Sequence, residues 1–166
     1  MITKIVSGAQ TGADRAGLDV AIRHGFPHGG WCPKGRKAED GAIGGQYQLV
    51  ETPSANYLQR TEWNARDSDG TVVLTLAREV TGGSLRTIEF AKKHKRPWIH
   101  ISRSGDFSPS VTLQGLVKDH DIGILNVAGS RESKEPGIWK CAYKVSGDAF
   151  FWREENQGIL GGPGEG

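Results

Sequence analysis

Two adjacent glycines, followed by hydroxyl and acidic residues, form a stretch suited to binding an anion. The stretch is TGGSLRTIE at residues 81–89, between an apolar run at 71–76 and a helix-like run at 85–94. Glycines at a strand-to-helix turn let a ligand approach the backbone closely, and the N–H groups that begin a helix favour a phosphate. Glu89, about one and a half turns into the helix, would place a carboxylate near that phosphate. The same residues are also compatible with an ordinary turn that has Glu89 on a solvated face, so the stretch alone leaves both interpretations open.

Two further polar turns also follow apolar runs. SGAQTGADR at residues 7–15 supplies backbone N–H groups, amide and hydroxyl side chains, and an acidic residue in the first turn of the next helix. LNVAGSRES at residues 125–133 supplies Asn126 and Arg131, and a guanidinium can hold a phosphate through two hydrogen bonds. The candidate ligand- and phosphate-binding residues are Gly8, Gln10, Thr11, Gly12, Asp14, Arg15, Lys34, Gly82, Gly83, Ser84, Thr87, Asn126, Gly129 and Arg131.

A long, glycine-rich connection at residues 33–45 carries charges of both signs. Lys34, Arg36 and Lys37 stand against Glu39 and Asp40. Long connections in compact domains are often functional. Two interpretations are open, a solvated charged loop or a basic flap that closes over an anionic ligand.

These turns need a scaffold in which strands and helices alternate. The apolar patterns predict strands and helices that follow one another along the chain. Strands are expected at 2–7, 71–76, 96–101 and 121–127, and helices at 13–24, 54–67, 85–94, 111–120 and from about 136. This rhythm predicts an α/β fold, a Rossmann-like three-layer α/β/α arrangement with a mostly parallel sheet. Ligands bind outside the carboxyl ends of such strands, so the three polar turns are expected to gather at one edge.

Further details of the helices follow from spacing and capping signals. Ser54 is a candidate cap for the 54–67 helix, and extended pieces are expected at 30–32 and 46–51. Within the 54–67 helix, one stripe holds Tyr57, Arg60, Thr61 and Asn64. Arg60 on this stripe is either a surface ion-pair partner or a ligand contact. Residues expected to pack together are Leu18, Ala21, Ile22 and Gly25 in one helix, and Ile138, Ala142, Val145, Ala149 and Trp152 in another.

Composition indicates a single soluble domain. The chain has 166 residues and a formal net charge of +2 with both signs interspersed, which argues against a dedicated nucleic-acid or membrane surface. We expect one domain over residues 1–157, a disordered glycine-rich tail over 158–166, and a cytoplasmic location. The two cysteines lack paired spacing, and the five histidines lack metal-binding spacing, so no metal site is expected. Neither G-x-x-x-x-G-K-[ST] nor G-x-G-x-x-G is present.

The motifs resemble a known superfamily. TGGSLRTIE resembles the PGGxGTxxE turn of lysine-decarboxylase-like phosphoribohydrolases, and Arg60 and the Ser68–Asp69 pair lie at similar offsets upstream. More closely, SGAQTGADR, WCPKGRKAEDG at 31–41 and LNVAGSRES resemble the putative molybdenum carrier family, a circularly permuted branch of the superfamily that also holds the Smf DNA-processing proteins. The matching segments lie between about residues 2 and 152.

The resemblance implies a site for a phosphorylated, nucleotide-like or pterin-type ligand. In the hydrolases, the arginine and glutamate that match Arg60 and Glu89 act together on an N-glycosidic bond, so these two are the candidate catalytic residues. Thr81, Leu85 and Arg86 depart from the hydrolase motif, which puts hydrolysis in doubt more than phosphate binding. The family name implies molybdenum cofactor as cargo, and relatives commonly form dimers, so a homo-oligomer is expected.

Three functions therefore stand as hypotheses. The first is a carrier that binds a phosphorylated pterin-type cofactor or nucleotide. The second is an enzyme, a nucleoside 5′-monophosphate phosphoribohydrolase that uses Arg60 and Glu89. The third, an Smf-like nucleic-acid accessory, is the weakest because the charge is balanced.

Overall fold

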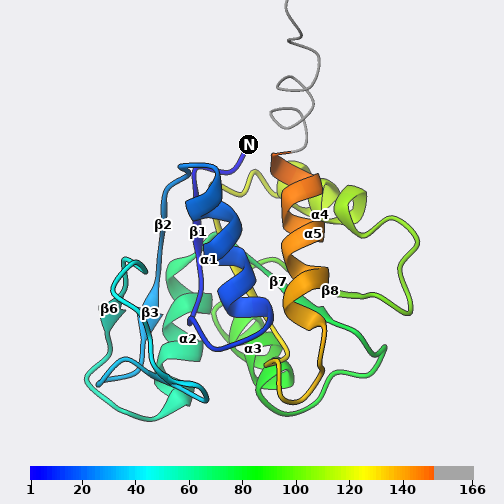
Figure 1. The fold of residues 1–166 in the computed structure, drawn as a ribbon. Helices are drawn as coiled ribbons and strands as arrows, with labels where there is room; N and C mark the ends of the chain where they lie inside the picture. Colours follow the sequence, from blue (N-terminus) through cyan, green and yellow to red (C-terminus); the bar gives the residue numbers. More distant parts are fainter. Residues whose placement is uncertain (152–166) are drawn as a thin grey trace, which may run out of the picture.

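A parallel sheet of five strands forms the centre of the molecule (Figure 1). The computed structural model describes residues 1–151. The strands are hydrogen-bonded in the order β2-β1-β9-β7-β8, with every neighbouring pair parallel. Their bounds are β1 Lys4–Val6, β2 His28–Gly29, β7 Gly70–Thr75, β8 Trp98–Ser102 and β9 Ile124–Gly129. The predicted α/β class with a mostly parallel sheet is confirmed.

Helices cover both faces of this sheet and complete the predicted Rossmann-like arrangement. Their bounds are α1 Ala13–Arg23, α2 Tyr57–Asp67, α3 Gly82–Lys93, α4 Pro109–Asp119 and α5 Ile138–Phe150. α5 packs against both α1 and α4, whereas α2 packs against α3 (Figure 1). This grouping places α2 and α3 together beside the strand ends that carry the polar turns.

The main core lies between the sheet and these helices. β7 is buried along its whole length, as an inner strand of a parallel sheet should be. The predicted apolar stripe of α5 is buried at Ile138, Ala142, Val145 and Ala149. The stripe predicted for α1 is only partly right, because Ile22 is exposed at 38% of its surface.

The segment between α1 and α2 is more ordered than the predicted loop. β3 Trp31–Cys32 pairs with β6 Val50–Glu51, and β4 Lys37–Ala38 pairs with β5 Gly41–Ala42 to form a small hairpin. These pieces share a second small core, made of Ala9, Leu18, Cys32, Ala38, Ile43 and Tyr47. The extended piece expected at 30–32 is therefore part of a separate two-stranded sheet, and β2 just before it joins the central sheet.

The predicted starts of two helices, α2 and α3, are wrong. α2 begins at Tyr57, because Asn56 caps it by accepting a hydrogen bond from Leu58 N at 2.9 Å. Ser54 instead receives a hydrogen bond from Asn56 N at 3.0 Å, outside the helix. α3 begins at Gly82 rather than at residue 85, so both glycines belong to its first turn.

Some predictions concern residues beyond the described part of the chain. Trp152, the domain end at residue 157 and the glycine-rich tail at 158–166 all lie outside residues 1–151. Within residues 1–151, none of the helices combines the length and the apolar character that crossing a membrane requires.

Candidate functional site

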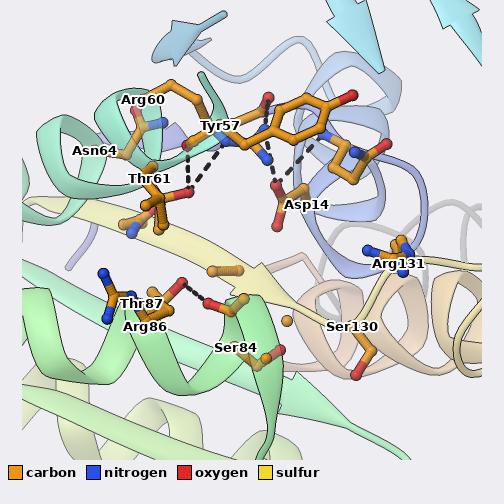
Figure 2. Close-up of a pocket in the computed structure, with 18 of the residues that line it drawn as sticks. Asp14, Tyr57, Arg60, Thr61, Asn64, Ser84, Arg86, Thr87, Ser130 and Arg131 are labelled. Atoms are coloured by element: carbon orange, nitrogen blue, oxygen red, sulfur yellow. Dashed lines mark hydrogen bonds and ion pairs between the residues drawn. The ribbon is translucent and has the colours of Figure 1, made fainter. Parts of the chain in front are cut away.

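A cleft of about 400 Å³ opens where the three polar turns meet. β1, β9 and β7 are neighbours in the sheet, so their carboxyl ends bring these turns together. Figure 2 shows Tyr57, Arg60 and Thr61 of α2 across the cleft from Ser84, Arg86 and Thr87 of α3. The lining residues are Gly8, Gln10, Asp14, Tyr57, Leu58, Arg60, Thr61, Asn64, Gly82, Gly83, Ser84, Arg86, Thr87, Asn126, Ala128, Gly129, Ser130, Arg131 and Lys134.

The N-terminus of α3 forms one wall of the cleft. No side chain caps this helix at Thr81, and Gly82, Gly83 and Ser84 of its first turn all line the cleft. Lys134 reaches the same point, with its Nζ donating to Thr81 Oγ1 at 2.6 Å and to Thr81 O at 3.2 Å. A helix start beside a lysine ammonium is a favourable place for an anion.

Arg60 is buried in the opposite wall. Its Nη1 donates to Gly8 O at 2.6 Å, and its guanidinium lies 5.1 Å from the centre of the Tyr57 ring. A Cβ at position 8 would lie 2.6 Å from that Nη1, so only glycine leaves room for the arginine there. The first polar turn and α2 are thereby fixed to each other through a single cation.

Asp14 lies beside Arg60 in the first turn of α1. Its side chain is 12% exposed, and its Oδ2 lies 3.7 Å from Arg60 Nη1 and receives a long hydrogen bond, 3.4 Å, from Gln10 N. Burial raises the pKa of Asp14 to about 6, and the neighbouring Arg60 charge opposes that rise without cancelling it. Asp14 therefore titrates close to neutral pH.

Positive charge dominates the lining of the cleft. Arg60, Arg86, Arg131 and Lys134 line it, and among the described lining residues Asp14 is the only carboxylate. These four cations come from two facing helices and the turn after β9, so they surround the same space. The arrangement favours a ligand that carries a concentrated negative charge.

Comparison with known proteins places the chain in a family. A model of the circularly permutated YpsA SLOG family matches residues 5–149. The chain belongs to this family. No functionally curated protein gives a significant match. The fold is similar to that of a solved structure from Syntrophus aciditrophicus SB, a putative molybdenum carrier protein, with 43% sequence identity and a TM-score of 0.86 over 90% of this chain and 95% of that one.

The structure brings together most of the residues predicted for the site of this SLOG-family chain. Arg60 lines the cleft, and the other predicted residues that line it are Gly8, Gln10, Asp14, Gly82, Gly83, Ser84, Thr87, Asn126, Gly129 and Arg131. The α2 stripe of Tyr57, Thr61 and Asn64 also faces the cleft beside Arg60.

Five predicted residues lie elsewhere. Glu89 is half-exposed on α3, where it pairs with Arg86 at 3.5 Å, and it does not line the cleft. Lys34 is exposed on the connection to the hairpin. Gly12, with φ at 81°, packs so closely on the third turn that a Cβ would lie 2.3 Å from Ser130 O. Thr11 and Arg15 contact the hairpin instead of the cleft.

The tip of the hairpin joins the first and third turns through its acidic residues. Glu39 accepts hydrogen bonds from Thr11 Oγ1 and from Ser133 Oγ, the latter at 2.5 Å, and lies 3.3 Å from Arg131 Nε. Asp40 pairs with Arg15 at 2.5 Å. Carboxylates thus make the side-chain contacts of this tip, and Glu39 N also donates to Gln10 Oε1 at 2.9 Å.

Sequence reasoning missed several lining residues. Lys134 follows the third turn directly, but nothing in the local letters indicates that its ammonium reaches Thr81 across the cleft. In the sequence, Arg86 stands out only as a departure from the hydrolase motif, yet its side chain lines the cleft. Glu132, by contrast, has a structural role, because its carboxylate accepts from Gly137 N at 2.6 Å and from Trp139 N at 2.9 Å and so caps α5.

Proposed function

We propose that this chain binds a phosphorylated, nucleotide-like or pterin-type ligand in the cleft, as a carrier or binding protein. The observation that carries the proposal is the convergence of an uncapped helix N-terminus with four cationic side chains on one space of about 400 Å³. Backbone N–H groups and cations together are the usual protein partners of phosphate. The phosphate would rest on Gly82, Gly83 and Ser84, next to Lys134.

The remaining part of such a ligand has a suitable surface at the rim. Tyr57 is exposed at 38% and Leu58 at 40%, and both line the cleft on the α2 side. An aromatic ring and a leucine that are open to solvent offer a face for a planar base or pterin ring. The Arg60 guanidinium lies 5.1 Å from the centre of the Tyr57 ring and packs against it.

The cargo suggested by the similar structure fits the donors of this cleft when it carries an anionic group. Among residues 1–151, no group of three or more His, Cys, Asp and Glu side chains could hold a metal ion. Direct coordination of molybdenum by these side chains therefore lacks support. A phosphate-bearing pterin, or molybdate as an oxyanion, would instead use the N–H groups of α3 and the cations described above.

The hydrolase alternative is less well supported by the arrangement. Arg60 lines the cleft, but Glu89 lies outside the lining and is paired with Arg86. A carboxylate must reach the reacting bond to assist its cleavage, and Asp14 is the carboxylate next to Arg60. We therefore favour binding without turnover.

Calorimetric titration with adenosine, guanosine and inosine 5′-monophosphates and with a phosphorylated pterin tests the proposal. We expect saturable binding of at least one of these compounds, weakened about tenfold in Lys134→Ala by the loss of a charge-assisted contact. Lys118→Ala is the matched control, because Lys118 is an exposed residue of α4 outside the cleft. This variant should bind as the wild type does.

The same samples separate the two functions when they are assayed for free base by chromatography. Binding without base release supports the carrier. Base release that disappears in Glu89→Gln would establish the hydrolase in its place, and absence of binding by every compound would contradict both.

A further inference from the structure

Asp14 is a buried carboxylate in a cleft lined mainly by cations. Its contacts within the protein do not explain why a negative charge lies there. It comes from the first turn of α1 and lies on the wall of the cleft below Tyr57 and Arg60 (Figure 2). A negative charge here repels the phosphate that the surrounding cations attract. A carboxylate in this position therefore weakens phosphate binding unless the ligand gives it a partner.

Inside the protein, Asp14 has two long contacts, and the backbone N–H of Gly129 also faces its carboxylate. Arg60 Nη1 is 3.7 Å away and uses its short hydrogen bond, 2.6 Å, on Gly8 O instead. Gln10 N is 3.4 Å away. Neither contact has the length of a charge-assisted hydrogen bond, which is about 2.7–2.9 Å for a guanidinium and a carboxylate.

The environment leaves the carboxylate ready for another donor. Burial is the main influence on its pKa and outweighs the positive charges of Arg60 and Arg15. Burying a charge without close partners is costly, and that cost is recovered when a ligand donates a hydrogen bond to it. In ligand sites, a few polar groups placed in this way determine which compound is accepted.

We propose that Asp14 is the specificity-determining residue of the cleft, accepting a hydrogen bond from an O–H or N–H group that the ligand carries beside its phosphate. The inference rests on the proposed function, because it needs a phosphorylated ligand in the cleft. Ribose hydroxyls and the N–H groups of a guanine or pterin ring are the two sources of such a donor. Asp14 thus separates these ligands from free inorganic phosphate, which cations alone would bind.

The test compares Asp14→Asn with the wild type against inorganic phosphate, ribose 5-phosphate, and adenosine and guanosine 5′-monophosphates. The variant keeps the shape of the side chain but removes the charge. We expect it to bind inorganic phosphate several-fold more tightly, because the repulsion is gone, and the donor-bearing ligand about tenfold more weakly. Asp148→Asn, on the surface of α5, is the matched control and should change neither affinity.

The pattern across the ligands identifies the donor. An equal loss for ribose 5-phosphate and both nucleotides assigns it to the sugar hydroxyls, and a loss confined to guanosine 5′-monophosphate assigns it to the ring. A change by the same factor for inorganic phosphate and for every other ligand would overturn the inference, because Asp14 would then only hold the turn in shape. If the wild type binds neither these four compounds nor the phosphorylated pterin, the proposed function itself fails.

A second measurement on the wild type avoids dependence on the folding of the variant. The affinity ratio of adenosine or guanosine 5′-monophosphate to methyl phosphate should fall several-fold between pH 7.5 and pH 5, as the carboxylate becomes protonated. The other groups that face Asp14 are the guanidiniums of Arg60 in α2 and Arg15 in α1 and the uncharged backbone N–H groups of Gln10 and Gly129. Guanidiniums in proteins are not deprotonated in this pH range. A ratio that stays constant for both nucleotides would contradict the role.

Discussion

Buried charge is the residue-scale feature that links the stability of this chain to its binding chemistry. Arg60 and Asp14 are both almost fully buried, although each is of a type that is rarely buried without a partner. Arg60 is satisfied by Gly8 O, by Thr61 Oγ1 and by the Tyr57 ring. Asp14 is not satisfied to the same degree, so its burial has a cost that measurements of stability will detect.

The buried carboxylate of Asp14 should make the stability of the fold depend on pH. The folded-state pKa of Asp14 is about 6, above the ordinary aspartate value of 3.8, so the folded protein binds more protons than the unfolded chain between these values. Its contribution to the free energy of unfolding therefore falls as pH rises from about 4 to about 6. Relative to the wild type, the free energy of unfolding of Asp14→Asn should rise by on the order of 2 kcal/mol between these pH values. Urea unfolding at each pH measures the difference. Identical pH profiles would show that Asp14 titrates normally.

The second prediction concerns the glycine beneath Arg60. In Gly8→Ala the new methyl would lie 2.6 Å from Arg60 Nη1 and 2.7 Å from its Cδ, so the arginine must move. We expect a loss of about 1–3 kcal/mol in the free energy of unfolding by urea denaturation, because a crowded interior resists added volume. Gly115→Ala, where no atom lies within 4 Å, is the control and should not be destabilised.

At the residue scale, the sequence predicts which segments line the cleft better than it predicts what individual side chains contact. The stripe that carries Arg60 was visible, but its burial depends on Gly8, which lies in a different turn. Lys134 could not have been found, because its reach to Thr81 is set by the packing of three separate segments. Glu89 was placed in the site by motif, whereas the helix turns it toward Arg86.

The start of α3 is the element-scale feature on which the proposed phosphate binding depends. The helix begins at the glycines themselves, so Gly82 and Gly83 contribute N–H groups of the first turn. Local propensity predicted a later start, because glycine is a poor helix former. The sequence does not show that Gly82 starts the helix with a φ of 58°, a backbone conformation that glycine adopts readily.

A third prediction separates binding from folding at this helix. A Cβ at position 83 would meet nothing within 4 Å inside the protein, so Gly83→Ala should fold with unchanged or slightly higher stability. Its methyl would instead occupy the space where a phosphate approaches the backbone. We expect phosphate-ligand affinity to fall about tenfold by calorimetry. Unchanged affinity would move the phosphate away from this turn.

The hairpin tip is the second element with a consequence for binding. Glu39 lies 3.3 Å from Arg131 Nε and so competes with a ligand for that cation. Glu39→Gln should therefore bind a phosphorylated ligand a few-fold more tightly in calorimetry, the modest size reflecting a solvent-exposed pair. Asp40→Asn, which breaks the Arg15 pair outside the cleft, should leave the affinity as it is. A weaker affinity in Glu39→Gln would show that the hairpin supports the site instead of competing with it.

At the scale of the whole molecule, sheet topology explains why three distant turns form one cleft. Residues 7–12, 81–84 and 128–133 meet because β1, β9 and β7 are adjacent and parallel. The alternation of strands and helices was sufficient to predict that convergence. The alternation was not sufficient to predict the small core under the hairpin. Cys32, Ile43 and Tyr47 of that core come from a segment rich in glycine and proline, a composition typical of loops.

The most direct test of the central claim is an amide NMR titration of the whole chain with inorganic phosphate and with a nucleoside 5′-monophosphate. We expect saturable shifts of the N–H signals of Gly82, Gly83 and Ser84, together with those of Gly129 and Ser130 in the lining of the cleft, while the signals of α4 stay in place. Absence of saturable shifts at residues 82–84, or shifts centred on another surface, would contradict the assignment of this cleft as a phosphate site.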